Sequence, residues 1–143
     1  MSGREPRWVD SRLVEAMHSR QLGEHGGTPG IRDAAGLDSA LARPRQWLAY
    51  GGPDEGDLPA LAAAYGLGIA RNRPFVDGNK RTAYVVCRTI LVLNDRDPAG
   101  SLAERDPVFL GVAAGDVGEA EFIEWMRRNS RPLRVSESVP AYR

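Results

Sequence analysis

The chain has 143 residues, a usual length for one domain, and 42% of them are hydrophobic, enough for one core. Its 19 Lys and Arg residues balance its 19 Asp and Glu residues. This balance argues against direct nucleic-acid binding or an anionic-membrane surface, but leaves room for a small phosphate site. The single cysteine, Cys87, excludes an internal disulfide. With no signal-peptide pattern and no membrane-length segment, we expect a cytoplasmic protein without membrane attachment.

Helical spacing dominates the first part of the chain. Asp10 is the expected N-cap of a first helix, whose apolar positions are Leu13, Val14, Met17 and Leu22. The glycines and proline of "EHGGTPGIRD" end it, and "AAGLDSALARP" predicts a short second helix that stops before Pro44. The stretch "RQWLAYGGPDEGD" predicts an irregular loop that exposes Trp47 and Tyr50, either as ordinary packing or as a surface for a protein partner.

The second part of the chain is also helical. Asp57 is the expected cap of a helix with the apolar stripe Leu58, Leu61, Ala62, Tyr65 and Ile69. The run "NKRTAYVVCRTILVLND" (79–95) is apolar on nearly all sides, which predicts the central, buried helix. Further helices are expected from Asp106 through Ala114 and around Phe122–Met126. No alternation is long enough for a sheet. We predict one all-α domain over residues 1–143, with a core at about 9–128 and an extended tail at 129–143.

The loop "RPFVDGNKRT" (73–82) carries the residues best suited to bind a ligand or take part in a reaction. If Gly78 and Asn79 begin the next helix, their unpaired N–H groups and the helix dipole favour an anion. Lys80 and Arg81 add donors for phosphate oxygens, and the Asn79 side chain can donate as well. Asp77 suits Mg²⁺, which binds one or two carboxylates together with substrate phosphates. The same residues also fit ordinary helix caps and a solvated edge, because short motifs often match by chance.

The stretch "RPFVDGNKRTA" resembles the signature of the Fic/Doc superfamily, roughly H-x-F-x-D-x-N-K-R-T, in its death-on-curing toxin branch. The similarity extends to "GEHGGTPGIRDAAGLDSALARPRQ" and covers about residues 9–128. It implies a Fic-type helical bundle around a buried central helix. It also implies transfer of part of a nucleoside triphosphate to a protein hydroxyl. Most Fic members transfer AMP, whereas the Doc toxin transfers the γ-phosphate to elongation factor Tu and is silenced by an antitoxin such as Phd.

The resemblance also implies roles for single residues. Asp77 would be the Mg²⁺ carboxylate, and Asn79, Lys80 and Arg81 would hold the phosphates of ATP or another nucleoside triphosphate, with help from the Gly78 backbone. AMP-transferring members typically have glycine at the position of Lys80. The lysine therefore favours phosphoryl transfer over AMP transfer.

Arg73 stands where the family has its catalytic histidine, the base that takes the proton of the target hydroxyl. A guanidinium stays protonated and has no free lone pair, so Arg73 cannot accept that proton. The chain as written is therefore expected to be impaired or inactive. Arg73 is either natural or an inactivating change, and the sequence leaves both origins open. Its spacing of four residues from Asp77 predicts an ion pair between the two in the absence of metal.

Three other residues carry groups that can react. His18 and His25 fall in the first helix or at its end, and we expect them to be surface or structural residues away from the loop. Cys87 has no base beside it, so we expect a buried hydrophobe rather than a nucleophile. Two functions stay open: a Doc-type toxin that is inactive in this form, and a catalytically dead Fic-domain binding module.

Overall fold

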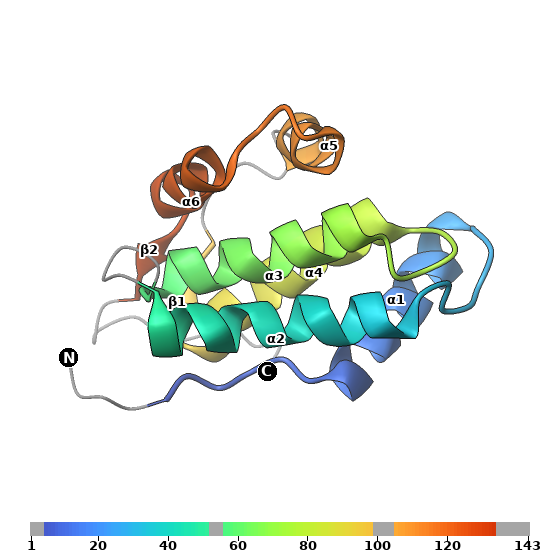
Figure 1. Ribbon diagram of the computed structural model, residues 1–143, viewed down its shortest axis with the longest axis horizontal. Coiled ribbons are helices and arrows are strands. Elements are labelled where there is room, and N and C mark those ends of the chain that lie inside the picture. The colour runs from blue at the N-terminus through green and yellow to red at the C-terminus, as the bar shows by residue number, and fades with distance from the viewer. Residues whose placement is uncertain (1–4, 52–55, 99–104, 134–143) are drawn as a thin grey trace.

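The computed structural model describes residues 5–51, 56–98 and 105–133. These residues form six helices and one small sheet, so the expected all-α class is confirmed. The helices are α1 (Ser11–His25), α2 (Ala34–Tyr50), α3 (Leu58–Asn72), α4 (Asn79–Leu93), α5 (Arg105–Ala114) and α6 (Glu119–Arg128). Figure 1 shows α2, α3 and α4 running side by side, with α1 across one end and α5 and α6 above them.

Helix α3 is the most enclosed element, because α2, α4, α5 and α6 all pack against it. Its residues from Pro59 to Ala70 are all buried. Many of them are Ala or Gly, and these small residues let neighbouring helices approach closely. A Cβ on Gly68 would lie 2.8 Å from the Ala40 Cα of α2. The expectation that residues 79–95 form the central helix is therefore wrong, because α3 is the central helix. Small side chains, rather than large apolar ones, characterise the helix at the centre of the fold.

Helix α4 is amphipathic rather than apolar on all sides. Its buried face comprises Asn79, Thr82, Ala83, Val86, Cys87, Ile90 and Leu91. Lys80, Arg81 and Arg88 are exposed on the other side. The helix therefore packs on α3 with one face and offers the other face, at its first turn, to solvent.

The second helix does not stop before Pro44, as the sequence suggested. Helix α2 continues to Tyr50 with Pro44 buried inside it. Leu37, Ala40 and Pro44 are its buried residues and share the face that packs on α3. Burial of that face outweighs the one backbone hydrogen bond that proline removes. Trp47 is consequently half-buried in a helix and packed against the core, while Tyr50 is 88% exposed.

Helices α5 and α6 occur where the sequence predicted them. The Phe109 ring of α5 packs edge-on against Tyr84 of α4, with ring centroids 5.7 Å apart, and against Phe122 of α6, at 5.2 Å. These contacts fix α5 above the first turns of α4. The same aromatic residue, Phe109, also lines the cavity described below.

A short sheet, which the sequence did not predict, joins β1 (Arg96–Asp97) to β2 (Arg131–Pro132). The strands are antiparallel, with Arg96 opposite Pro132 and Asp97 opposite Arg131. Two-residue strands are too short to show the alternation from which strands are predicted. Of the tail expected to be extended, residues 134–143 lie outside the described residues.

Candidate functional site

The loop 73–78 joins the end of α3 to the start of α4. Arg73 caps α3 in the left-handed conformation, with φ 49° and ψ 56°, and its N–H donates to the Ile69 carbonyl. The Arg32 guanidinium donates to the carbonyl oxygens of Asn72, at 2.8 Å, and Arg73, at 2.9 Å. Four carbonyls at a helix end normally lack partners, and Arg32 satisfies two of them. Arg32 therefore holds the turn from which the loop begins.

The loop pairs along its length with the segment that connects α1 to α2. The Val76 N–H donates to the Gly30 carbonyl at 3.0 Å, and the Arg32 N–H donates to the Pro74 carbonyl at 2.7 Å. Ile31 and Phe75 form an antiparallel bridge. Two connecting segments thus stabilise each other through backbone hydrogen bonds, which keeps the loop in one conformation.

Asn79 holds the loop to the helix that follows it. Its side-chain oxygen accepts from the Phe75 N–H, and its side-chain nitrogen donates to the Phe75 carbonyl, each at 3.0 Å. Both residues are buried. The side chain expected to bind phosphate is therefore engaged with the loop backbone. What Asn79 still offers an incoming anion is its backbone N–H in the first turn of α4.

The Asp77 carboxylate is held by backbone groups. It accepts from the Thr28 N–H at 3.2 Å and from the Gly78 N–H at 3.1 Å. Within the described part of the chain, no ion pair joins Asp77 to Arg73. The predicted pair is therefore wrong, because two amides already partner the carboxylate and Arg73 is exposed at the other end of the loop.

Helix α4 begins without a side-chain cap. Its N-cap is Gly78, with φ 77°, a left-handed conformation that glycine adopts without strain. Its first turn holds no acidic residue, while it does hold Lys80 and Arg81. Cations beside the positive end of a helix dipole are unfavourable unless an anion joins them. The start of α4 is thus chemically suited to bind an anion.

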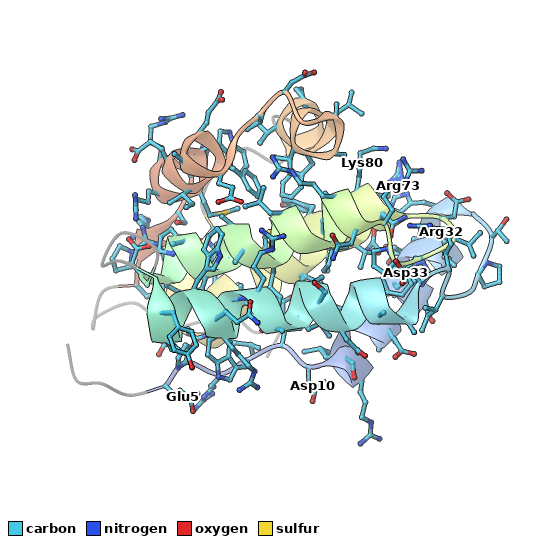
Figure 2. The ribbon with its side chains drawn as sticks, in the orientation of Figure 1. Glu5, Asp10, Arg32, Asp33, Arg73 and Lys80 are labelled. Atoms are coloured by element: carbon cyan, nitrogen blue, oxygen red, sulfur yellow. The ribbon has the colours of Figure 1, made fainter. Side chains whose placement is uncertain are left out.

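Two hollows open beside this helix start. One has a volume of about 790 Å³ and is lined by Asp77, Gly78, Asn79, Lys80 and Arg81, by the end of α1, including Gln21 and His25, and by Phe109 and Leu110 of α5. The other, of about 80 Å³, lies between Arg73, Lys80 and Ala113. Figure 2 shows Arg73 and Lys80 close to each other at this end of the molecule. The fold therefore brings all the expected site residues together, with Arg73 on the smaller hollow and Arg81 on the larger.

The donor set fits a metal ion that is shared with a ligand. The described residues contain no cluster of three or more metal-binding side chains. One carboxylate at the edge of a cavity is nevertheless what Mg²⁺ uses when substrate phosphates and water complete its octahedron. Asp77 is exposed, and each of its oxygens has a lone pair beyond the one that accepts an amide proton.

His18 is a residue whose place the sequence analysis missed. It is 4% exposed, and its Nε2 lies 2.8 Å from the Asp77 carbonyl oxygen. The expectation that His18 lies away from the loop is wrong. The sequence held a signal for its burial, though not for its contact with the loop, since His18 follows Val14 by one helical turn and so extends the buried stripe of α1. His25 also reaches the site, as part of the wall of the larger hollow.

Cys87 is structural, as expected. It is 2% exposed and its thiol donates to the Ala62 carbonyl. Burial raises the pKa of the Cys87 thiol above its usual value, which keeps it protonated. A protonated, enclosed thiol is a poor nucleophile, so Cys87 takes no part in the site.

Sequence comparison identifies the group of proteins that share these features. The sequence model of the Fic/DOC family matches residues 8–91, more than half of the chain and the whole of the loop and of its pairing segment. The chain belongs to the Fic/DOC family. It is 28% identical to the Protein kinase doc of Escherichia phage P1 over 122 residues, which cover 85% of this chain and 94% of that protein.

A second relative is similar over a shorter length. The chain is 45% identical to the Toxin Doc of Mycolicibacterium smegmatis over 69 residues, which cover 48% of this chain and 52% of that protein. The membership expected from the signature is thus confirmed, and both relatives are Doc proteins. None of the described helices has the length and apolar character required to cross a bilayer.

Proposed function

We propose that the chain is a Doc-type toxin whose site binds Mg²⁺ and a nucleoside triphosphate at the start of α4. The observation that carries the proposal is the uncapped helix start, where Lys80 and Arg81 occupy the first turn beside a cavity of about 790 Å³. The names of the two relatives, a protein kinase and a toxin, support the same assignment. The reaction class is transfer of a phosphoryl group, less favourably of AMP, to a hydroxyl of a target protein.

Each site residue has a role that follows from its chemistry. The backbone N–H groups of Asn79 and Lys80 point along the helix axis toward the cavity and bind phosphate oxygens together with both cations. The Asp77 carboxylate faces the same space and binds Mg²⁺, which would neutralise charge on the phosphates. The Lys80 side chain occupies room beside the phosphates, which favours presentation of the γ-phosphate.

The Arg73 position sets the level of activity in this proposal. Arg73 lines the smaller hollow beside Lys80, at the start of α4, so its side chain is placed to meet a phosphate. It cannot accept a proton from a target hydroxyl. We therefore propose that transfer is severely impaired while nucleotide binding persists, and a catalytically dead binding module is the second candidate for the same reason. An antitoxin of the Phd type is the proposed partner, and elongation factor Tu is the proposed target.

Calorimetry with ATP and Mg²⁺ tests the binding step. We expect the unmodified chain to bind and a Lys80→Ala, Arg81→Ala double variant to bind at least about tenfold more weakly, because two charge-assisted contacts are lost. Arg88→Ala is the matched control, since Arg88 is an exposed cation of α4 beyond the cavity. Equal heats for the unmodified chain and the double variant would reject the proposed function.

A further inference from the structure

The His18 side chain is buried among site residues, yet the proposed reaction assigns it no role. Its ring stacks on the Phe75 ring, with centroids 3.8 Å apart and planes at 10°. Its Cδ2 and Nε2 atoms come within 3.7 Å of the place where a Cβ on Gly78 would be. With the Nε2 contact to the Asp77 carbonyl, His18 therefore contacts Phe75 and Asp77 and lies beside Gly78.

The direction of the hydrogen bond follows from its acceptor. A carbonyl oxygen only accepts, so Nε2 of His18 carries the proton and donates to Asp77. The ring is only 4% exposed, so it does not reach a hydroxyl of a target protein. His18 is thus no substitute for the missing base, and its contribution must act through the loop.

The contact reaches the Asp77 carboxylate through one peptide group. The carbonyl of residue 77 and the N–H of residue 78 belong to the same planar unit and point in opposite directions. His18 holds the carbonyl end of that unit at 2.8 Å. The N–H at the other end donates to the Asp77 Oδ1 atom at 3.1 Å. Fixing one end of the plane therefore fixes the donor that orients the carboxylate.

We infer that His18 is a positioning residue for Mg²⁺ binding: its Nε2–H orients the 77–78 peptide plane and, through the Gly78 N–H, the Asp77 carboxylate. The inference rests on the proposed function, because it assumes that Asp77 binds the metal of a metal–nucleotide complex. Partners that orient a metal ligand in this way typically change metal affinity by about 10- to 100-fold when removed.

Two substitutions separate the hydrogen bond from the packing. His18→Phe keeps a flat ring that can stack on Phe75 but removes the donor. His18→Gln keeps an N–H group at the position of Nε2 but removes the ring. The measurement is the ATP affinity of each purified variant by calorimetry, once with Mg²⁺ and once with EDTA, on protein shown to be folded by circular dichroism.

The ratio of the ATP affinity with Mg²⁺ to that with EDTA measures how much the metal contributes to binding. We expect His18→Phe to lower the affinity measured with Mg²⁺ by about tenfold or more while leaving the affinity in EDTA unchanged, and His18→Gln to retain most of the Mg²⁺ effect. A residue that only packs would give the opposite order, with the Phe variant intact. Retained Mg²⁺ dependence in folded His18→Phe, or an equal loss in the Gln variant, overturns the inference and leaves the proposed function standing.

Two further results also bear on the inference. If His18→Phe does not fold, His18→Asn replaces it, because its amide is one methylene too short to reach the Asp77 carbonyl. The Gln variant must then bind Mg²⁺–ATP about tenfold more tightly than the Asn variant, and equal affinities overturn the inference. If the unmodified chain does not bind Mg²⁺–ATP at all, the proposed function fails and the role of His18 fails with it.

Discussion

The starts of α3 and α4 differ although both follow a loop that contains an aspartate. At α3, Asp57 caps the helix by accepting from the Ala60 N–H at 3.0 Å and also pairs with the Arg127 guanidinium at 2.9 Å. At α4, Asp77 precedes the glycine N-cap and accepts no hydrogen bond from the helix beyond it. The first carboxylate bonds its own helix and a cation of α6, whereas the second bonds only backbone N–H groups and lies at the edge of a cavity.

The difference is between a helix start stabilised by its own residues and one that keeps its N–H donors open. At the start of α3, Asp57 accepts from the Ala60 N–H, Pro59 has no N–H to satisfy, and Arg127 of α6 pairs with the capping carboxylate. The start of α4 leaves donors open and adds Lys80 and Arg81, which by themselves oppose the helix dipole. Placing two cations at this helix start costs free energy. The hydrogen bonds of Asn79 to Phe75 and the backbone pairing of the loop stabilise the same segment and offset that cost.

The largest expected effect comes from Arg73→His. If the start of α4 binds the phosphates, a base is what the site lacks, and general-base catalysis is typically worth about two to four orders of magnitude in rate. Histidine also tolerates the left-handed conformation of residue 73 better than most side chains do. We expect the variant to label a protein of a bacterial lysate from γ-labelled ATP and to arrest growth when it is expressed without an antitoxin.

Arg73→Asn is the matched control for this experiment. Asparagine is equally compatible with the left-handed backbone and also removes the guanidinium, but it supplies no base. Labelling by the His variant that does not exceed labelling by the Asn variant would contradict the proposed reaction. Stronger labelling from α-labelled than from γ-labelled ATP would instead assign AMP transfer.

The sequence predicted the fold class and the helix starts well, because these depend on local patterns. The aspartate caps at residues 10 and 57 are confirmed. Each side chain accepts a hydrogen bond from the backbone N–H three residues later in the sequence. The choice of central helix was wrong, since hydropathy gives little weight to the Ala and Gly residues that let α3 be surrounded. The end of α2 was wrong as well, because packing along α3 carries that helix through Pro44.

The site was predicted from residues adjacent in the sequence, and those residues do lie together. What could not be predicted is the long-range part: Thr28 on the Asp77 carboxylate, Arg32 on the end of α3, and His18 on the loop carbonyl. Each of these contacts spans 40 residues or more of sequence. A local motif cannot specify such contacts, and they replaced the Arg73–Asp77 pair that spacing alone suggested.

Asn79→Ala should have the next largest effect, which we expect on the free energy of unfolding. The substitution leaves the N–H and carbonyl of Phe75 buried without the two hydrogen bonds of 3.0 Å that now satisfy them. At about 1–3 kcal/mol for each of the two unsatisfied groups, we expect the free energy of unfolding in urea to fall by roughly 2–6 kcal/mol.

Asn72→Ala provides the scale for this measurement. The Asn72 side chain makes a single hydrogen bond, 2.9 Å long, to the Gly36 carbonyl. Its removal leaves one group without this partner, whereas removal of the Asn79 side chain leaves two. Its substitution should cost about 1 kcal/mol. If Asn79→Ala costs no more than Asn72→Ala, then Asn79 does not support the loop, and its side chain becomes available again as a phosphate ligand.

Asp57→Ala, at the start of α3, should have a smaller effect than Arg73→His or Asn79→Ala. Loss of a cap costs about 1 kcal/mol, and the half-exposed pair with Arg127 adds at most about 1 kcal/mol. Asp57→Asn should cost less, because asparagine caps as well as aspartate and only the charge is lost. Neither substitution should change ATP affinity per folded molecule, since Asp57 does not line the cavity beside α4. If the Ala variant binds ATP tenfold more weakly while remaining folded, the two helix starts are coupled, and binding cannot be assigned to the open one alone.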